Sequence, residues 1–393
     1  MSNATRIWSA SRNPQGLSEI EVASGIVVGQ GSGKRFPTGV GNDPMGVLRE
    51  LARAALSTPP CVVAFSGGRD SSALLAFLLD VARRDGLPEP IAVTARWDDD
   101  EASDESAWQE EVIRTIGAEQ WEILRPGNDL DLLGEEATSS LEAMGLMWPA
   151  PAYALRPLFR QAKGGVLLSG EGGDEAFGLY PYGRLWQSIR SHSLPRQSDV
   201  RALVLGCLPR PVRRWRWKKI RPAYQTWLST GGFDLVSEAM ADDGADDPLR
   251  WGPYQVISRR RRAMDLTLGT LESLAEIEGA RYQGPFLDEG FLAALGHWGG
   301  SFGRGDRTDV MSTLFADVLP GPILSRVSKA SFAGVFWGAE SRRFASEWDG
   351  TGLPLEFIKP DALRAAWQAP VPVYGAALPL HAAWLASQLL ENP

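Results

Sequence analysis

Short apolar runs alternate with stretches of helical spacing along the first half of the chain. The runs read CVVAF at 61–65, IAVTA at 91–95, WEIL at 121–124 and VLLSG at 166–170. Each has the length and composition of a buried strand. Between them, apolar residues recur at helical intervals over 72–86, 104–117 and 153–164. Strands that alternate with helices predict an α/β fold with a doubly wound parallel sheet covered on both faces.

The pattern differs at the two ends of the chain. Residues 1–45 are rich in Gly, Ser, Asn and Pro, so we expect a loosely structured segment or a small hairpin there. After about residue 185, amphipathic helical stretches replace the strand patterns. The sequence therefore predicts an N-terminal segment over 1–45, an α/β core over 46–200 and a largely helical C-terminal half over 201–393.

Composition and charge argue against several function classes. The chain has 393 residues and a net charge of −8, whereas nucleic-acid-binding domains carry a basic excess. No run approaches the roughly 18 apolar residues of a membrane span, and the first residues lack a signal-peptide pattern. Two cysteines, Cys61 and Cys207, fit a reducing compartment. We therefore expect a cytoplasmic protein with no nucleic-acid partner and no membrane partner.

One stretch departs from this acidic average. RPVRRWRWKKIRP, residues 210–222, interleaves basic residues with tryptophan. Such stretches occur on surfaces that dock nucleic acids or acidic peptides, and they also occur as solvated helix faces. As a docking surface, this stretch would fit an acidic peptide or carrier, and both interpretations stay open.

The segment CVVAFSGGRDSS, residues 61–72, joins a predicted buried strand to a helix through a glycine turn. Glycines let the backbone approach a ligand closely. The first amides of the helix have no intrahelical partner and carry the positive end of the helix dipole. With the hydroxyls of Ser66, Ser71 and Ser72, they form a cradle suited to phosphate groups. The carboxylate of Asp70 fits such a site if Mg²⁺ lies between it and the phosphates.

A second glycine-rich turn follows the last predicted strand, in VLLSGEGGDEAFGLY at 166–180. The carboxyl ends of parallel strands meet at one edge of a doubly wound sheet. Asp174 can therefore face Asp70 across a bound metal–triphosphate, where both carboxylates would offset phosphate charge through Mg²⁺.

These segments carry a resemblance to a known family. SGGRDSS resembles the pyrophosphate-binding loop of the PP-loop ATP pyrophosphatases, and SGEGGDEAFGLY resembles the SGEGxDExFGGY motif of the asparagine synthetase domain. GPFLDEGFLAAL (284–295) and VLPGPILSRVSKASF (318–332) resemble two further segments of that domain, in the same order. The chain is thus similar to the asparagine synthetase family, which includes β-lactam synthetase and lasso-peptide macrolactam cyclases, over roughly residues 60–335.

The resemblance implies ATP and Mg²⁺ as cofactors and assigns roles to particular residues. Asp70 and Asp174 would coordinate Mg²⁺, and Gly170 would lie against the nucleotide. Lys329 would stabilise charge on the reacting α-phosphate and on the acyl intermediate. The pyrophosphate loop would consist of Ser66, Gly67, Gly68, Asp70, Ser71 and Ser72.

The implied reaction is AMP-forming amide synthesis. A carboxylate of a small molecule or a peptide attacks the α-phosphorus of ATP, and pyrophosphate leaves. An amine from ammonia, from the substrate or from a partner protein then attacks the acyl-adenylate. In such chemistry the protein acts mainly by positioning and electrostatics.

Three departures from the family pattern bear on this expectation. Residue 2 is Ser, not the cysteine nucleophile of the family's glutaminase domain, and only about 45 residues precede the core, so we expect no glutaminase activity. Arg281 and Gln283 stand where the family carries Glu and Arg, which leaves Glu171 or Glu278 as candidate general base. RTDVMSTLF (307–315) lacks the basic residue that relatives often carry in the corresponding helix.

Several functions remain open at this point. SKASFAGVFWG (328–338) is more similar to the peptide-cyclase branch, which favours specialised or lasso-type peptide biosynthesis. The alternatives are an ammonia-dependent asparagine synthetase, a non-catalytic nucleotide-binding partner protein and another PP-loop enzyme, such as one that thiolates RNA. The missing Glu at position 281 favours a non-catalytic protein, whereas the presence of Asp70, Asp174 and Lys329 opposes it.

Overall fold

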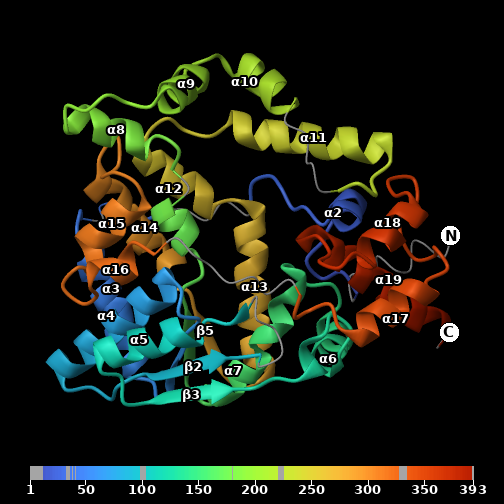
Figure 1. Ribbon diagram of the computed structural model, residues 1–393, viewed down its shortest axis with the longest axis horizontal. Helices are drawn as coiled ribbons and strands as arrows, with labels where there is room; N and C mark the ends of the chain where they lie inside the picture. The colour runs from blue at the N-terminus through green and yellow to red at the C-terminus, as the bar shows by residue number, and fades with distance from the viewer. Residues whose placement is uncertain are drawn as a thin grey trace.

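The computed structural model describes residues 12–31, 36, 37, 39, 41–97, 103–178, 180–219, 225–326 and 334–391. Helices surround a single five-stranded sheet in these residues (Figure 1). The first helices are α2 (Glu19–Ser24), α3 (Pro44–Leu56), α4 (Arg69–Asp85), α5 (Ser106–Ile116), α6 (Glu135–Met144), α7 (Arg156–Gln161), α8 (Gly183–Arg190), α9 (Gln197–Gly206) and α10 (Arg210–Trp217). The later helices are α11 (Thr230–Ala245), α12 (Trp251–Arg259), α13 (Arg262–Ile277), α14 (Glu289–Gly299), α15 (Arg307–Phe315), α16 (Gly321–Leu324), α17 (Ala339–Glu347), α18 (Pro360–Trp367) and α19 (Ala377–Glu391).

The five strands are parallel and lie in the order β3-β2-β1-β4-β5. They are β1 (Cys61–Ala64), β2 (Ile91–Ala95), β3 (Trp121–Leu124), β4 (Val166–Ser169) and β5 (Arg281–Gln283). The predicted α/β class and all four predicted strands are confirmed. The strand β5 is not evident from the sequence because it has only three residues, and two of them, Arg281 and Gln283, are polar.

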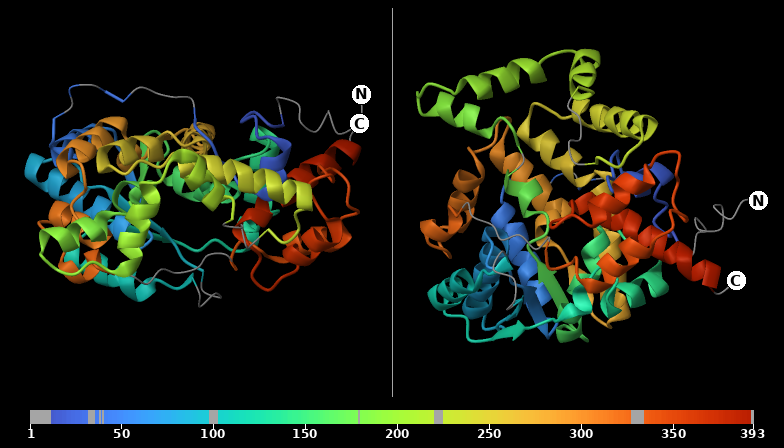
Figure 2. Two further views of the ribbon diagram at one scale, coloured as in Figure 1. Left: turned by 90° about the horizontal axis from the view of Figure 1, so that it is seen from above. Right: turned by 45° about the vertical axis from the view of Figure 1, so that its right-hand side comes forward.

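Side chains of the strands alternate between two separate cores. On β1, Val62 enters one core, whereas Cys61 and Val63 enter the other. The first core includes side chains of α7, α13 and α17–α19, and the second includes those of α3, α4, α14 and α15. Both faces of the sheet are therefore covered, which explains why its central strands are apolar throughout. The helices α17–α19 lie at the opposite end of the molecule from α5 (Figure 2).

The N-terminal segment, expected to be loosely structured or a small hairpin, contains the helix α2 among its described residues. Ser18 caps α2, and its backbone amide donates to the carboxylate of Glu21 at 2.8 Å, while the amide of Glu21 donates back to the Ser18 hydroxyl. This reciprocal capping box satisfies two donors at the start of a short helix. Val22 and Ala23 are fully buried in the first core, so packing holds this segment in place.

The order of the strands reverses between β1 and β4. From β1 the chain builds β2 and β3 on one side, and then returns to build β4 and β5 on the other. Ligands of doubly wound sheets bind outside the carboxyl ends of the strands at such a switch point. Ala64 of β1 is level with Ser169 of β4. The two glycine-rich segments that follow these strands therefore begin side by side.

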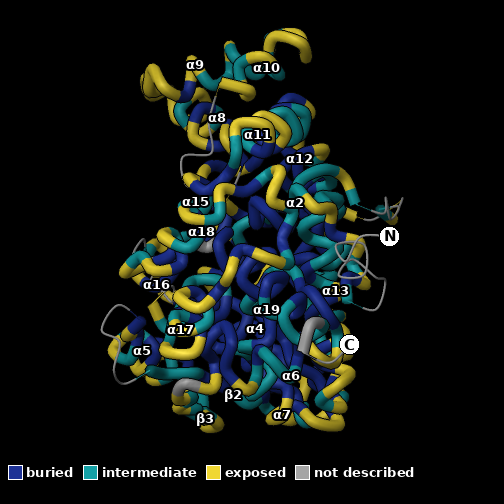
Figure 3. The backbone as a smooth tube through the Cα atoms, turned by 90° about the vertical axis from the view of Figure 1, so that its right-hand side faces the viewer, coloured by how far each residue is buried: buried dark blue, intermediate teal, exposed yellow. Residues whose placement is uncertain are grey.

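Helices α8, α9 and α10 form a projection that we call the arm, defined as residues 183–219. The arm stands away from the sheet at one end of the molecule (Figure 3). Its last helix, α10, lies along α11 and places Trp217 against Gly244, where a Cβ atom would come within 2.5 Å of the indole ring. The arm is therefore attached to the protein through α11 as well as through its own two ends.

Candidate active site

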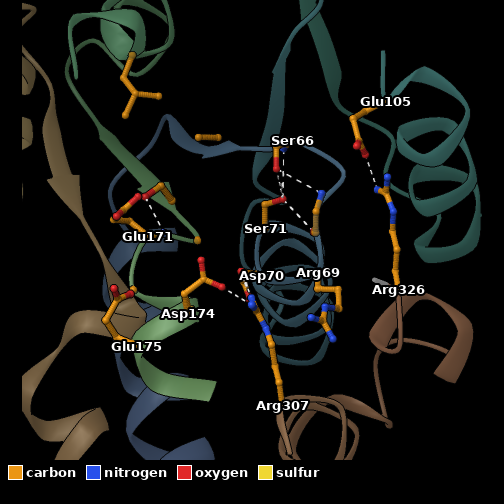
Figure 4. Close-up of a pocket in the computed structure, with 17 residues that line it drawn as sticks. Ser66, Arg69, Asp70, Ser71, Glu105, Glu171, Asp174, Glu175, Arg307 and Arg326 are labelled. Atoms are coloured by element: carbon orange, nitrogen blue, oxygen red, sulfur yellow. Dashed lines mark hydrogen bonds and ion pairs between the residues drawn. The ribbon is translucent and has the colours of Figure 1, made fainter. Parts of the chain in front are cut away.

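A cavity of about 440 Å³ lies at the carboxyl ends of β1 and β4. Its walls come from the segment after β1 with the start of α4, from the segment after β4, and from the first residue of α15 (Figure 4). Glu105, before α5, Leu155, before α7, and Arg326, after α16, complete the lining. The cavity therefore lies at the switch point of the sheet, where a ligand is expected.

The segment after β1 folds into a tight loop that opens the start of α4 toward the cavity. Gly67 has φ +83°, a conformation that favours glycine. The hydroxyls of Ser66 and Ser71 lie 3.0 Å apart, and the amide of Gly68 donates to the Ser66 hydroxyl at 3.3 Å. Gly68, the N-cap of α4, has no side chain that could accept a hydrogen bond from the first amides of the helix. The first amides of a 17-residue helix are thus available to an anion.

The segment after β4 lies directly against this helix start because two of its residues are glycines. A Cβ atom at Gly170 would lie 2.8 Å from the amide nitrogen of Ser71, and one at Gly173 would lie 2.3 Å from Cγ of Asp70. Larger residues at either position would force the two segments apart. The chain then enters a wide π-type turn, η4 (Asp174–Gly178), a feature often found at functional sites. This approach brings Asp174 beside Asp70.

Both aspartates contact the same guanidinium group. Nη2 of Arg307 donates to the two carboxylate oxygens of Asp70 at 2.7 and 2.5 Å, and Nη1 donates to Oδ1 of Asp174. Figure 4 shows the two carboxylates pointing toward Arg307 from different segments. The geometry thus brings Asp70 and Asp174 together at one cavity, as their positions in the sequence predict.

Burial changes the protonation equilibria of the charged groups in this cavity. Desolvation raises the pKa of Asp70 in spite of the opposing effect of Arg307, and desolvation also raises the pKa of Glu175. The pKa of Arg69 is lowered, first by desolvation and then by Arg307. For Arg307, desolvation acts to lower the pKa, but Asp70 and Asp174 outweigh it and the net direction is upward. Such perturbed groups cluster at functional sites.

The donor chemistry of the cavity fits Mg²⁺ bound together with phosphates. Within the described ranges, no group of three or more His, Cys, Asp or Glu side chains could hold a metal by itself. Mg²⁺ needs only one or two carboxylates when substrate phosphates supply further oxygens, and Asp70 and Asp174 provide these. Nε of Arg307 is buried and has no hydrogen-bond partner among the described residues, so the guanidinium has a donor left for an anion.

Comparison with known families now identifies the chain. The family model described as asparagine synthase matches residues 47–378. The chain belongs to the asparagine synthase family. No curated protein matches the chain. The resemblance inferred from the four motifs is thereby confirmed, and membership of this family makes the chain an ATP-dependent synthetase of the amidation type in general.

Most of the site residues predicted from the sequence line the cavity. They are Ser66, Gly68, Asp70, Ser71, Gly170, Glu171 and Asp174. Gly67 lies at its edge, where its carbonyl oxygen accepts a hydrogen bond of 3.2 Å from Arg326. Lys329 lies outside the described residues.

Ser72 does not contribute a hydroxyl to the cavity. Its side chain is fully buried, and its hydroxyl has no hydrogen-bond partner in the part of the chain that the structure describes. Its amide donates to the carbonyl oxygen of Gly68 within the first turn of α4. Ser72 therefore lies on the inner face of the helix, one position beyond the last hydroxyl that reaches the cavity.

Of the two candidate bases, only Glu171 lies at the cavity. Glu278 forms ion pairs with Arg156 and Arg160. The next residue, Gly279, accepts a hydrogen bond from Gly164 before the amino end of β4. Glu278 therefore lies at the opposite edge of the sheet, too far away to take a proton from a group in the cavity.

The two positions before PFLD that depart from the family pattern, Arg281 and Gln283, also lie outside the cavity lining. Arg281 begins β5, level with Val166 at the amino end of β4, and it is exposed. Gln283 is level with Leu168, and neither residue lines the cavity. The loss of Glu at position 281 therefore removes no carboxylate from the cavity lining.

Sequence reasoning missed the basic residues of the site. RTDVMSTLF is expected to lack the basic residue that relatives often carry in this helix, yet its first residue, Arg307, brings a guanidinium group to the site and bridges Asp70 and Asp174. Asp306 and Asp309 form a capping box at this point. The sequence DRTD, residues 306–309, therefore predicts the start of α15. The meeting of Arg307 with Asp70 was not readable, because the two residues are 237 positions apart.

Arg326 holds the middle of the segment 318–332 beside the loop after β1. It is almost fully buried, forms an ion pair with Glu105 and lies 4.8 Å from the ring centroid of Trp108. It also donates to Gly67, as described above. Because a buried ion pair with hydrogen bonds has little freedom, the chain just before residues 327–333 is fixed at the cavity.

No helix among the described residues combines the length and the apolar character that crossing a membrane requires.

Proposed function

We propose that this member of the asparagine synthase family is an AMP-forming amide-bond synthetase that adenylates a carboxylate and passes the acyl group to an amine. The observation that carries the proposal is the meeting of Asp70 and Asp174 at one cavity, beside the open start of α4. This arrangement supplies both oxygen ligands for a cation and amides for phosphates.

The residues around the cavity have separate tasks in this proposal. The amides at the start of α4 and the hydroxyls of Ser66 and Ser71 bind the phosphates of ATP. Asp70 and Asp174 hold Mg²⁺, which when bound neutralises charge on the phosphates. Arg307 and Arg69 place positive charge where pyrophosphate departs, and preorganised charge of this kind lowers the barrier to the chemical step.

Glu171 is the proposed general base for the attacking amine. It lines the cavity, and its amide donates to the hydroxyl of Ser169 at 3.2 Å. That hydroxyl lies 2.7 Å from the hydroxyl of Tyr282 on β5. The backbone at Glu171 is therefore tied to the end of β4 through Ser169, whose hydroxyl contacts Tyr282, and this favours a defined position for the Glu171 carboxylate.

Lys329 is the proposed stabiliser of the α-phosphate and of the acyl intermediate. It is three residues after Arg326, whose side chain is fixed at the cavity by Glu105 and Gly67. The support for this role is the match of K-x-x-F to the family motif. A lysine carries a point charge on a flexible stem, which suits the task.

The substrate carboxylate belongs to a small molecule or a peptide, and the amine comes from ammonia, from the substrate itself or from a partner protein. Peptide cyclisation of the lasso type is the favoured case, supported by the sequence over 328–338. An ammonia-dependent asparagine synthetase is the alternative. The two differ in the substrate that drives exchange, because asparagine formation requires aspartate.

Two measurements test the proposal in order. The first is Mg²⁺-dependent binding of α,β-methylene ATP, which cannot be cleaved between the α and β phosphates. We expect Asp70→Asn to abolish this binding and Asp85→Asn, on the exposed end of α4, to leave it unchanged. The second is ATP–pyrophosphate exchange with a panel of amino acids and peptides, in which one carboxylate should support exchange and release AMP.

Each outcome has a clear meaning. Failure of the wild-type protein to bind the analogue with Mg²⁺ overturns the proposal. Binding without exchange for every carboxylate in the panel supports the non-catalytic alternative instead. If exchange occurs, Glu171→Gln should slow amide formation but spare exchange, since the base acts after adenylation. Glu175→Gln is the matched control in the same cavity, and an equal effect there would contradict the role of Glu171.

A further inference from the structure

The arm differs from the rest of the chain in charge. Residues 183–219 contain eight arginines and two lysines but a single acidic residue, Asp199, in a chain whose net charge is −8. The remainder of the protein is therefore more acidic than the whole. A concentration of one sign of charge on a projecting element attracts partners of the opposite sign.

The arm also carries exposed apolar side chains. Leu194, between α8 and α9, is 96% exposed, and Trp215 on α10 is 60% exposed. The large apolar side chains that are exposed on the arm are Ile189, Leu194, Val200, Val204, Val212, Trp215 and Trp217. Apolar groups gathered on one exposed element, with charges between them, mark an interaction surface.

The contacts of the arm with α11 show which chemistry its arginines recognise. Arg210 donates to both carboxylate oxygens of Asp246 at 2.6 and 3.1 Å, and Arg214 donates to both oxygens of Asp242 at 2.7 and 3.1 Å. Two-pronged pairs of this kind are specific to the planar guanidinium group. The arm therefore already binds carboxylates on the side that faces the protein.

Two other arginines of the arm are exposed and can pair with the carboxylates of a partner. Arg196 and Arg201 are exposed, and neither forms an ion pair with any residue that the structure describes. Val200 and Val204 lie on the same helix, α9, as Arg201. The exposed part of the arm therefore offers guanidinium groups next to aliphatic side chains.

We propose that the arm docks an acidic polypeptide segment that also carries apolar side chains. Exposed Trp and Arg are the residue types that dominate binding energy in protein interfaces. Apolar side chains of a partner can cover Leu194 and Trp215, while its carboxylates pair with Arg196 and Arg201. The inference goes beyond the proposed reaction, and the binding does not depend on turnover.

Charge and shape favour a short polypeptide over an extended polyanion. An anionic bilayer or a nucleic acid extends past the arm and meets the acidic remainder of the protein, which repels it. A short segment stays on the arm. The excess of arginine over lysine agrees with carboxylate pairing, since a bilayer surface attracts either type of charge.

The base of the arm lies close to the cavity. A Cβ atom at Gly183 would come within 2.1 Å of the carbonyl oxygen of Gly305, and Arg190 donates to the carbonyl oxygen of Gly303 at 2.7 Å. The turn 303–306 leads directly into Arg307, which contacts Asp70 and Asp174. A polypeptide held on the arm is therefore tethered near the site where the proposed reaction takes place.

Selection from a library of random dodecapeptides displayed on phage tests the docking proposal on the full-length protein. We expect the enriched sequences to be rich in Asp and Glu and to contain Leu, Ile, Phe or Trp. The most enriched sequence, made with a fluorescein label, then gives a dissociation constant by fluorescence anisotropy. Neutral or basic consensus sequences, or no enrichment, would overturn the proposal.

Two variants of the arm and one matched control locate the binding surface. Trp215→Ala should weaken binding of the labelled peptide about thirtyfold, as expected for an aromatic hot spot. Arg196→Glu with Arg201→Glu should weaken it at least about tenfold and reduce its salt dependence. Lys163→Glu with Lys359→Glu reverses two exposed charges elsewhere and should have no effect. Equal binding by all variants would contradict docking on the arm.

The same proteins distinguish the competing partners. Two further assays measure co-sedimentation with vesicles of equimolar phosphatidylcholine and phosphatidylglycerol, and binding to a single-stranded DNA oligonucleotide. Strong binding by the wild type in either assay, lost in Trp215→Ala, would overturn the proposal. Thermal melting confirms that each variant is folded. Because α,β-methylene ATP binding is measured separately, failure of the arm to bind peptide and failure of the proposed reaction give different results.

Discussion

Two regions of this protein hold aspartates in hydrogen bonds, one in the buried core and one at a partly exposed cavity, and the hydrogen-bond donors differ between them. In the core between α17 and α19, Asp131 is 2% exposed and accepts hydrogen bonds from the amides of Leu133, Glu340 and Ser341 at 2.9, 3.0 and 3.1 Å. The Ser341 hydroxyl also donates to it. Nearly all of these donors belong to the backbone.

In the cavity, the partners are side chains from distant segments. Asp70 and Asp174 come from the two glycine-rich segments, and the described residue that bridges them, Arg307, comes from α15. A backbone donor cannot leave without unfolding, whereas a side chain can change its rotamer and give its place to a ligand. Backbone donors therefore fix the buried Asp131 in a structural role, whereas the partly exposed Asp70 and Asp174 can exchange their side-chain partner for a ligand.

The largest expected effect separates activity from stability at Asp70. Asp70→Asn should reduce ATP–pyrophosphate exchange about 1,000-fold, because a neutral amide cannot hold the cation that offsets phosphate charge. The midpoint of urea unfolding should change little, since the amide still accepts a hydrogen bond from Arg307. If Asp70→Asn lost much stability but kept exchange, Asp70 would be structural like Asp131, and the contrast between the cavity and the core would fail.

The opposite result is expected at Asp131. Asp131→Ala should lower the free energy of unfolding by about 3 kcal/mol, because several buried donors lose their acceptor. Asp131→Asn keeps one acceptor oxygen and should lose less. Guanidinium-induced unfolding measures both changes, and binding of α,β-methylene ATP per folded molecule should stay at the wild-type level. A loss of nucleotide affinity without a loss of stability would be evidence against a structural role.

The third effect concerns the bridging guanidinium. Arg307→Met should slow exchange about 100-fold, because it removes positive charge from the site where pyrophosphate departs. Arg307→Lys should recover part of the rate, as it restores the charge without the two-pronged geometry. Steady-state kinetics with varied ATP would show the loss. Wild-type kinetics in Arg307→Met would mean that Arg307 only balances the two aspartates.

The smallest effect is a pH dependence of stability in the α19 core. His381 is fully buried, its Nε2 lies 2.8 Å from the carbonyl oxygen of Leu132, and desolvation lowers its pKa from 6.5 to about 4. The titratable group packed beside it is Tyr153, at 6.0 Å between ring centroids, and burial keeps that phenol neutral by raising its pKa.

Protonation of His381 is therefore more favourable in the unfolded chain, and stability is lost as the pH falls from 6.5 toward 4. The loss between about pH 7 and about pH 5 should be about 2 kcal/mol. His381→Gln keeps a donor for Leu132 but cannot titrate, so the difference between its unfolding free energy and that of the wild type should vary with pH in this window. A constant difference would contradict the neutral state of His381.

Local pattern was sufficient for much of the fold and part of the site. The central strands were readable because both faces of the sheet are buried, so each strand is a short apolar run between turns. The positions of Asp70 and Asp174 at the cavity were readable because parallel strands end at one edge. The helix α2 was also readable, from the capping box at Ser18 and Glu21, although its glycine-rich surroundings suggested a hairpin.

The sequence by itself determined the strands, the two glycine turns and the aspartates that follow them, because these depend on periodicity and on residues close together in the chain. Only the tertiary structure decided that Arg307 meets Asp70, that Ser72 faces inward and that Glu278 lies at the far edge of the sheet. These outcomes depend on how helices pack across the sheet. Packing brings together residues separated by hundreds of positions, and no local pattern records which side chains will then touch.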